Sequence, residues 1–225
     1  MEFNQEMTPI DHLYIRLIGQ FDSLIPFLGL THEEIFLTLQ ENCIDWFSDK
    51  QQLALPNTFN QYSVQVSHAG FLLGYSYVEA FITDLIREIF NARRDLLPQE
   101  KSLKFIDILP LENYEQIIIK MIDSTLGDMN SLEKKVLRLE KLGLQVTQSE
   151  KIIEGHTVRH ALIHNSGRIN REQSPTSQWK IGDVIELTSS DVNNFGLAAR
   201  EYALKISNKA NLMCYRNKVS IIALN

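Results

Sequence analysis

The segment from Val158 to Gly167 carries the side chains of this chain that are best suited to phosphate chemistry. Arg159 and His164 are separated by four residues; His160 follows the arginine directly, and Asn165 follows His164. A guanidinium offers a planar fork of donors that fits a phosphate, and an imidazole gives or takes a proton near neutral pH. These groups could cleave a phosphodiester without a metal ion. We predict Arg159 and His164 as catalytic residues, with His160 and Asn165 in support.

The same segment has the pattern of a helix end. Asn165 and Gly167 are residues that close a helix in the left-handed conformation, and a glycine just past the last turn is a common stop. Because each residue of a helix turns ~100°, Arg159 and His164 lie about 140° apart and do not share a face. Either the long arginine and a loosened last turn bring them together, or two copies of the helix meet across a two-fold axis. We favour the second arrangement.

The Arg159-x4-His164 motif resembles the Arg-x4-6-His signature of the HEPN (higher eukaryotes and prokaryotes nucleotide-binding) superfamily. Two features of context support the resemblance. The motif lies at the end of a late helix, and the earlier stretch Phe71–Phe81 is similar to the helix that packs beside it in those proteins. The resemblance covers roughly residues 62–206. It implies an all-α, HEPN-type helical bundle whose site forms at a homodimer interface.

The activity that the resemblance implies is that of a metal-independent endoribonuclease, in which the RNA 2′-hydroxyl attacks the neighbouring phosphate. The expected partners are an RNA substrate and a second copy of the chain, and no cofactor is expected. A toxin–antitoxin or host-defence setting would add a neutralising antitoxin protein. The alternative is a non-catalytic HEPN-like binding or dimerisation module, because many proteins of that superfamily serve in this way.

The histidines of the segment also allow a metal site. His156, His160 and His164 recur every four residues, and histidines four apart are the helical zinc spacing. Such a site would take a further ligand from elsewhere, such as Glu79 or His68. No Asp or Glu lies in this stripe, so we favour the ribonuclease and predict no metal. His156 and Glu79 are then expected to contact the catalytic residues and position them, without touching the RNA themselves.

A purely structural interpretation is also open. In it, Arg159 forms a salt bridge with Glu79 or Asp84, and His164 is a cation that caps the helix end near the C-terminal dipole.

Composition limits the function classes. The chain has 225 residues, 44% of them hydrophobic, which is enough for one domain with an extension. A net charge of −6 argues against a protein that coats nucleic acid through bulk charge, so any RNA contact must be local.

Cys43 and Cys214 lie in apolar helical patterns and are predicted to be buried free thiols, as suits a reducing cytoplasm. Residues 1–6 lack a signal-peptide pattern and no apolar segment approaches membrane-spanning length, so we expect a soluble cytoplasmic protein without a membrane partner.

The first 60 residues are predicted to form two helices and a loop. Thr8-Pro9 caps a helix that ends at Pro26 and Gly29, and Thr31-x-x-Glu34 is a capping box that begins another. Residues 51–60, with Pro56-Asn57, are predicted to be a loop. We therefore expect an N-terminal helical extension over residues 1–55 and a HEPN-like helical domain over residues 56–225.

The rest of the chain is predicted to be mainly helical. Apolar residues in a 4-3-4-3-4 rhythm from Phe71 to Ile89 predict a long helix over residues 60–92. Three shorter helices follow, the second capped at Asn130-x-x-Glu133 and the third, which carries the motif, at Thr147-x-x-Glu150. Residues 168–181 are predicted to be an exposed loop. A small β element is expected at residues 183–187, paired with Ile169 or with residues 219–222, and a last helix begins after residues 188–191.

Overall fold

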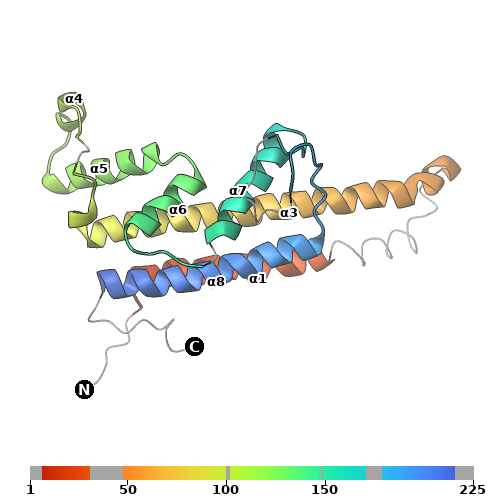
Figure 1. The fold of residues 1–225 in the computed structure, drawn as a ribbon, viewed down its shortest axis with the longest axis horizontal. Helices are drawn as coiled ribbons and strands as arrows, with labels where there is room; N and C mark the ends of the chain where they lie inside the picture. The colour runs from red at the N-terminus through yellow and green to blue at the C-terminus, as the bar shows by residue number, and fades with distance from the viewer. Residues whose placement is uncertain (1–6, 31–47, 100–101, 148, 171–178, 216–225) are drawn as a thin grey trace, which may run out of the picture. The chain divides into compact units, whose positions relative to one another are not determined.

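The computed structural model describes residues 7–30, 48–99, 102–147, 149–170 and 179–215, and these residues are mainly helical. The all-α fold class is confirmed at this level, since the described ranges contain helices and no strand. Figure 1 shows their course. The elements are α1 (Pro9–Leu30), α3 (Asp49–Ala92), the 3₁₀ helix η2 (Arg94–Leu96), α4 (Phe105–Ile108), α5 (Tyr114–Asp128), α6 (Leu132–Lys141), α7 (Ser149–His164) and α8 (Ser189–Cys214).

The chain forms two compact units. Unit 1 comprises Met1–Arg16, Glu79–Ser149 and Glu201–Asn225, and unit 2 comprises Leu17–Val78 and Glu150–Arg200. Helices α1, α3 and α8 therefore contribute residues to both units. The border predicted after residue 55 falls inside α3. All residues of the predicted site except Glu79 belong to unit 2.

Helix α3 confirms the helix predicted over residues 60–92, and it begins earlier, at Asp49. The loop predicted over residues 51–60 is therefore wrong. The prediction relied on Pro56-Asn57. A proline inside a helix costs about 3 kcal/mol, but the packing of a long helix can offset that cost, so residue propensity alone does not decide the structure. The apolar face predicted from the spacing of residues 71–89 is confirmed, because all six of its positions are buried: Phe71, Tyr75, Val78, Ile82, Leu85 and Ile89.

The apolar character of α3 also corrects a sequence expectation. Over Gln61–Ala92 the helix is long and apolar enough to span a bilayer by length and composition, with half of its most apolar window buried inside the structure. No such segment was expected from the sequence. A largely buried core helix of a soluble protein meets the same two criteria, so this finding is weak support for a membrane segment.

Helix α1 begins as predicted. The Thr8 hydroxyl accepts a hydrogen bond from the backbone of Asp11, whose carboxylate accepts one from the backbone of Thr8. Asn211 of α8 joins the two, with its Oδ1 2.7 Å from the Thr8 hydroxyl and its Nδ2 2.9 Å from Asp11 Oδ1. The helix ends at Leu30, one residue after the predicted stop at Gly29, but Pro26 lies inside it rather than at its end. The capping box at residues 31–34 lies outside the described residues.

Local capping interactions also fix the ends of the shorter helices of unit 1. Asn113 caps α5 by accepting from the backbone of Gln116, and Ser131 caps α6 by accepting from the backbone of Lys134. The cap of α6 is thus one residue later than predicted from Asn130. Gly143 follows α6 with a φ of 83°, which is the conformation that ends a helix at glycine.

Both cysteines, Cys43 and Cys214, were predicted to be buried free thiols. Cys214 is a free cysteine at the end of α8, as predicted, but it is half-buried rather than fully buried. Its burial raises its pKa to about 11. Cys43 lies outside the described residues.

The small β element predicted after the motif is not confirmed as a strand. The described residues contain one isolated antiparallel bridge between Arg168 and Val184. Backbone hydrogen bonds join Ile185 to Gly167 and Ile169 to Asp183, at 2.8 and 3.0 Å. The pairing stays short because Gly167 and Gly182, with φ of 79° and 93°, turn the chain at its ends. The second pairing partner, residues 219–222, lies outside the described residues.

Candidate functional site

Helix α7 ends at the motif, as the sequence predicts. The backbone N–H groups of Asn165 and Gly167 both donate to the carbonyl of Ala161, at 3.0 and 2.9 Å. Ser166 and Gly167 have φ of 51° and 79°, so two successive residues in the left-handed region reverse the chain after His164. This stop places His164 in the last helical turn, where a positive charge interacts favourably with the helix dipole.

His160 and His164 form a stacked pair on α7. Their ring centroids are 4.9 Å apart and their planes are inclined by 51°. The contact follows from their spacing, because residues four apart lie above one another on a helix. His164 is exposed and His160 is half-buried. We call these two residues the histidine pair.

Asn165 contacts the histidine pair from the end of the helix. Its Nδ2 lies 3.4 Å from Nδ1 of His160. An amide can donate through its nitrogen or accept through its oxygen, so this side chain can serve a neutral or a protonated His160 ring. The supporting residues His160 and Asn165 are thus brought together with His164.

Arg159 lies in different surroundings, with Tyr75 and His156. The Arg159 guanidinium carbon is 5.9 Å from the centroid of the Tyr75 ring, within the range of a cation–π contact. The Tyr75 hydroxyl is 2.9 Å from Nδ1 of His156. We call Tyr75, His156 and Arg159 the tyrosine cluster. These contacts join α7 to α3, and Figure 1 shows the two helices crossing.

Glu79 belongs to unit 1, where its carboxylate forms an ion pair with Lys135 at 3.3 Å. Asp84, the other carboxylate considered for Arg159, pairs with Arg16 and with Arg87 in the same unit. Each acid therefore has a basic partner in unit 1. The bracing role predicted for Glu79 stays a prediction.

The geometry gives no support to the metal alternative. Among the described residues, no group of three or more His, Cys, Asp or Glu side chains could hold a metal ion. Within the histidine stripe, His156 directs Nδ1 to the Tyr75 hydroxyl, whereas His160 and His164 stack on each other.

His68, considered as a further zinc ligand, lies on α3 beside the paired segment that follows the motif. Burial lowers its pKa below the ordinary value of 6.5, although the backbone of Ile185 and the carboxylate of Glu186 act in the opposite direction. Its Nε2 is buried without a hydrogen-bond partner among the described residues. These surroundings favour a neutral imidazole in the folded protein.

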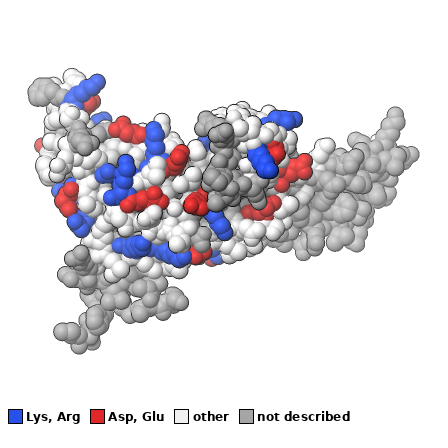
Figure 2. All heavy atoms as spheres, in the orientation of Figure 1, with Lys and Arg blue, Asp and Glu red and all other residues white. Residues whose placement is uncertain are grey.

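Charges of both signs are intermixed on the face of the described residues that Figure 2 shows. A basic cleft would favour contact with RNA, and a uniformly acidic surface would favour a binding module. The visible face is neither of these.

Tyr75 is the residue that the sequence did not reveal as part of the site. It was predicted only as one apolar position in the rhythm of α3, and its side chain is indeed buried, with 1% of its surface exposed. A tyrosine at such a position needs a hydrogen-bond partner for its hydroxyl. That requirement is a usable signal, although it does not identify His156 as the partner.

Comparison with family models, with curated proteins and with solved structures yields no match for this chain. The resemblance to the HEPN superfamily consequently stands on the motif and its helical context alone.

Proposed function

We propose that this protein is a metal-independent endoribonuclease of HEPN type, acting as a homodimer. The observation that carries the proposal is the stacked, partly exposed histidine pair at the end of α7. Two adjacent imidazoles can supply both the base and the acid of a phosphoryl transfer near neutral pH.

The reaction requires no group from outside the RNA and the protein. His164 takes the proton of the 2′-hydroxyl while the 2′-oxygen forms a bond to phosphorus. The bond from phosphorus to the 5′-oxygen breaks, and His160 supplies the proton that the leaving oxygen needs. The products are a 2′,3′-cyclic phosphate and a 5′-hydroxyl. Proton transfer by a positioned side chain contributes about 10²–10⁴ in rate.

Arg159 is assigned to the negative charge that develops on the phosphate oxygens. Removing one preorganised donor of this kind costs about 10²–10³ in rate. The surroundings of Arg159 and His164 differ, since one lies on Tyr75 and the other on His160. This difference favours a site that a second copy completes, with the arginine of one protomer beside the histidine pair of its partner.

The proposal is tested by incubating the purified protein with labelled RNA in excess EDTA. Cleavage should persist, the products should carry 2′,3′-cyclic phosphates, and a 2′-O-methyl group at the cut site should block the reaction. His164→Ala should reduce the rate by at least about 10²-fold. His12→Ala, at an exposed histidine of unit 1, is the matched control and should cleave normally.

Two results would contradict the proposal. If EDTA abolishes cleavage and zinc restores it, the histidines form a metal site. If a folded dimer cleaves no RNA, the alternative of a HEPN-like binding or dimerisation module is correct. A toxin–antitoxin or host-defence role, with a neutralising partner, would be the next question only after cleavage is established.

A further inference from the structure

Arg168 follows the motif and is the one arginine of the described residues whose guanidinium has no hydrogen bond, ion pair or ring contact. The other described arginines each have a partner, and they are Arg16, Arg87, Arg93, Arg94, Arg138, Arg159 and Arg200. The Arg168 side chain is also exposed. Its fork of donors is therefore available to an anion from solution.

The turn after α7 brings Arg168 close to the histidine pair. The backbone N–H of Arg168 donates to the carbonyl of Asn165 at 3.0 Å, and the side chain of Asn165 lies 3.4 Å from Nδ1 of His160. In a turn closed by such a bond, the first and fourth Cα atoms are less than about 7 Å apart. Because the turn lies within one chain, Arg168 belongs to the same protomer as the histidine pair beside it.

The backbone of Arg168 is held in place by its pairing with Val184. Hydrogen bonds of the two flanking residues, Gly167 and Ile169, fix this pairing on both sides. Side chains alternate between the two faces of an extended segment, and Ile169 is buried. The Arg168 side chain is consequently on the face that is directed to solvent.

The acids of the paired segment do not neutralise Arg168. The carboxylate of Asp183 accepts from the backbone N–H of Lys180 at 2.8 Å, and the charge of Glu186 acts on His68. Among the described residues, neither acid forms an ion pair with Arg168. A positive charge without a counter-charge thus lies close to the exposed His164.

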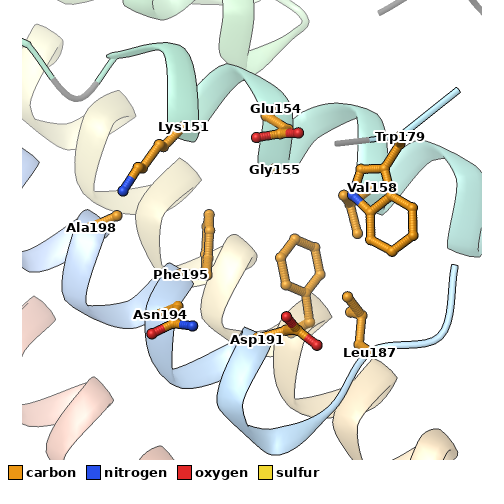
Figure 3. A pocket seen from close by; sticks show the side chains of 11 residues that line it. Lys151, Glu154, Gly155, Val158, Trp179, Leu187, Asp191, Asn194, Phe195 and Ala198 are labelled. Atoms are coloured by element: carbon orange, nitrogen blue, oxygen red, sulfur yellow. The ribbon is translucent and has the colours of Figure 1, made fainter. Parts of the chain in front are cut away.

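The N-terminal part of α7 has a different electrostatic character. A cavity within unit 2 lies there, between α7 and α8. Figure 3 shows the carboxylates of Glu154 and Asp191 at this cavity, together with Lys151. Two acids beside one base disfavour a polyanion. The charge on α7 and its C-terminal turn therefore favours an RNA strand at the end that carries Arg168.

We infer that Arg168 binds an RNA phosphate next to the one that is cleaved, and so positions the strand against the histidine pair of its own protomer. This inference rests on the proposed function, because it takes RNA as the substrate. A donor must be preorganised to stabilise a transition state, and an exposed side chain without partners is not. Arg168 therefore contributes to substrate binding, whereas the chemical step is assigned to Arg159 and the histidine pair.

The contact is tested with a labelled single-stranded RNA that carries 2′-O-methyl groups, which block the nucleophile and prevent cleavage. Its binding to the full chain is followed by fluorescence anisotropy at increasing salt concentrations. Each phosphate contact of a single strand adds about 0.7 to the slope of log affinity against log salt. Arg168→Gln should reduce the slope by that amount and should weaken binding about tenfold at low salt. Arg168→Lys should keep the slope, because an ammonium also neutralises a phosphate.

Lys120→Gln is the matched control, because Lys120 is an exposed residue of α5 in unit 1 and its loss changes the net charge by the same amount. This variant should keep the wild-type slope.

Cleavage provides a second measurement. On RNA with several phosphates, Arg168→Gln should raise KM about tenfold and leave kcat unchanged, since it removes a contact that the bound substrate and the transition state share. On a dinucleoside monophosphate, which has only the cleaved phosphate, the same variant should react as fast as the wild type.

An unchanged salt slope in Arg168→Gln, an equal change in Lys120→Gln, or no RNA binding by the wild type would overturn the inference. Slower cleavage of the dinucleoside monophosphate by Arg168→Gln would also overturn it, because Arg168 would then act on the cleaved phosphate or on the fold. The two proposals fail separately. Cleavage with an unchanged slope would refute only the role of Arg168, and a reduced slope without cleavage would refute only the nuclease.

Discussion

The hydroxyl of Tyr75 lies 2.9 Å from Nδ1 of His156, and the ring of the same tyrosine lies beneath the guanidinium of Arg159. One side chain of α3 thus positions two residues of α7 that are one turn apart. Among the residues that the structure describes, Arg159 contacts this aromatic ring and forms no ion pair with a carboxylate. A guanidinium held in this way keeps its fork of donors available to a phosphate.

Tyr75→Phe tests the hydrogen-bonded half of this arrangement. The ring is kept, but Nδ1 of His156 loses its partner at a partly buried position, so the free energy of unfolding should fall by about 1–2 kcal/mol. Urea denaturation measures this change. Tyr114→Phe, at an exposed tyrosine that lies beside Arg94, should change stability by less than about 0.5 kcal/mol. Equal effects of the two substitutions would show that the Tyr75 hydroxyl contributes nothing specific.

The end of α7 depends on glycine at position 167. Gly167 has a φ of 79°, which costs a residue with a Cβ about 1–2 kcal/mol. Gly167→Ala should therefore lower stability by that amount. Gly19→Ala is the control, because this helical glycine of α1 has open space around it and the same substitution should stabilise by up to about 1 kcal/mol. A neutral Gly167→Ala variant would show that the left-handed stop does not hold the motif.

The burial of His68 predicts a dependence of stability on pH. Burial lowers the pKa of His68 in the folded state. The His68 imidazole therefore binds a proton near pH 6.5 in the unfolded chain, but only at a lower pH in the folded chain. Stability should therefore be full above about pH 7 and should fall as the pH drops below the unfolded value of 6.5. His68→Gln should reduce this fall, whereas His12→Gln should not. Parallel pH profiles for the wild type and His68→Gln, from urea denaturation, would refute the account.

Local features of the fold were predictable from sequence, and contacts between distant segments were not. The stop after His164 follows from Asn165 and Gly167, and the stacking of the histidine pair follows from their spacing of four. The contact between Tyr75 and His156 joins residues 81 positions apart, which no local pattern reveals. The start of α3 was missed for a related reason, because Pro56 argues locally against a helix that its wider context maintains.

A composite site predicts complementation between inactive variants. If Arg159 of one protomer serves the histidine pair of its partner, a heterodimer of Arg159→Ala and His164→Ala chains holds one intact site and one with both changes. Random mixing yields half heterodimers, so the mixture should recover about a quarter of wild-type activity. The measurement is RNA cleavage after the two variants are unfolded and refolded together, with each refolded alone as the control. No recovery in a confirmed heterodimer would place both residues in one protomer's site.

The most direct test of the central claim is the rate of RNA cleavage against pH for the wild type, Arg159→Lys and His164→Ala. Arg159→Lys keeps the charge but loses the fork of donors, so its rate should fall about 10²–10³-fold and should not recover at any pH. His164→Ala removes the proton carrier and should flatten the pH dependence of the remaining activity.

Arg94→Lys is the matched control in this measurement, because Arg94 also lies 5.9 Å from a tyrosine ring, that of Tyr114, in unit 1. It should cleave as fast as the wild type, and circular dichroism and dimer mass should be unchanged in all the variants. Wild-type cleavage by Arg159→Lys, or an unchanged pH profile in His164→Ala, would contradict the proposed nuclease.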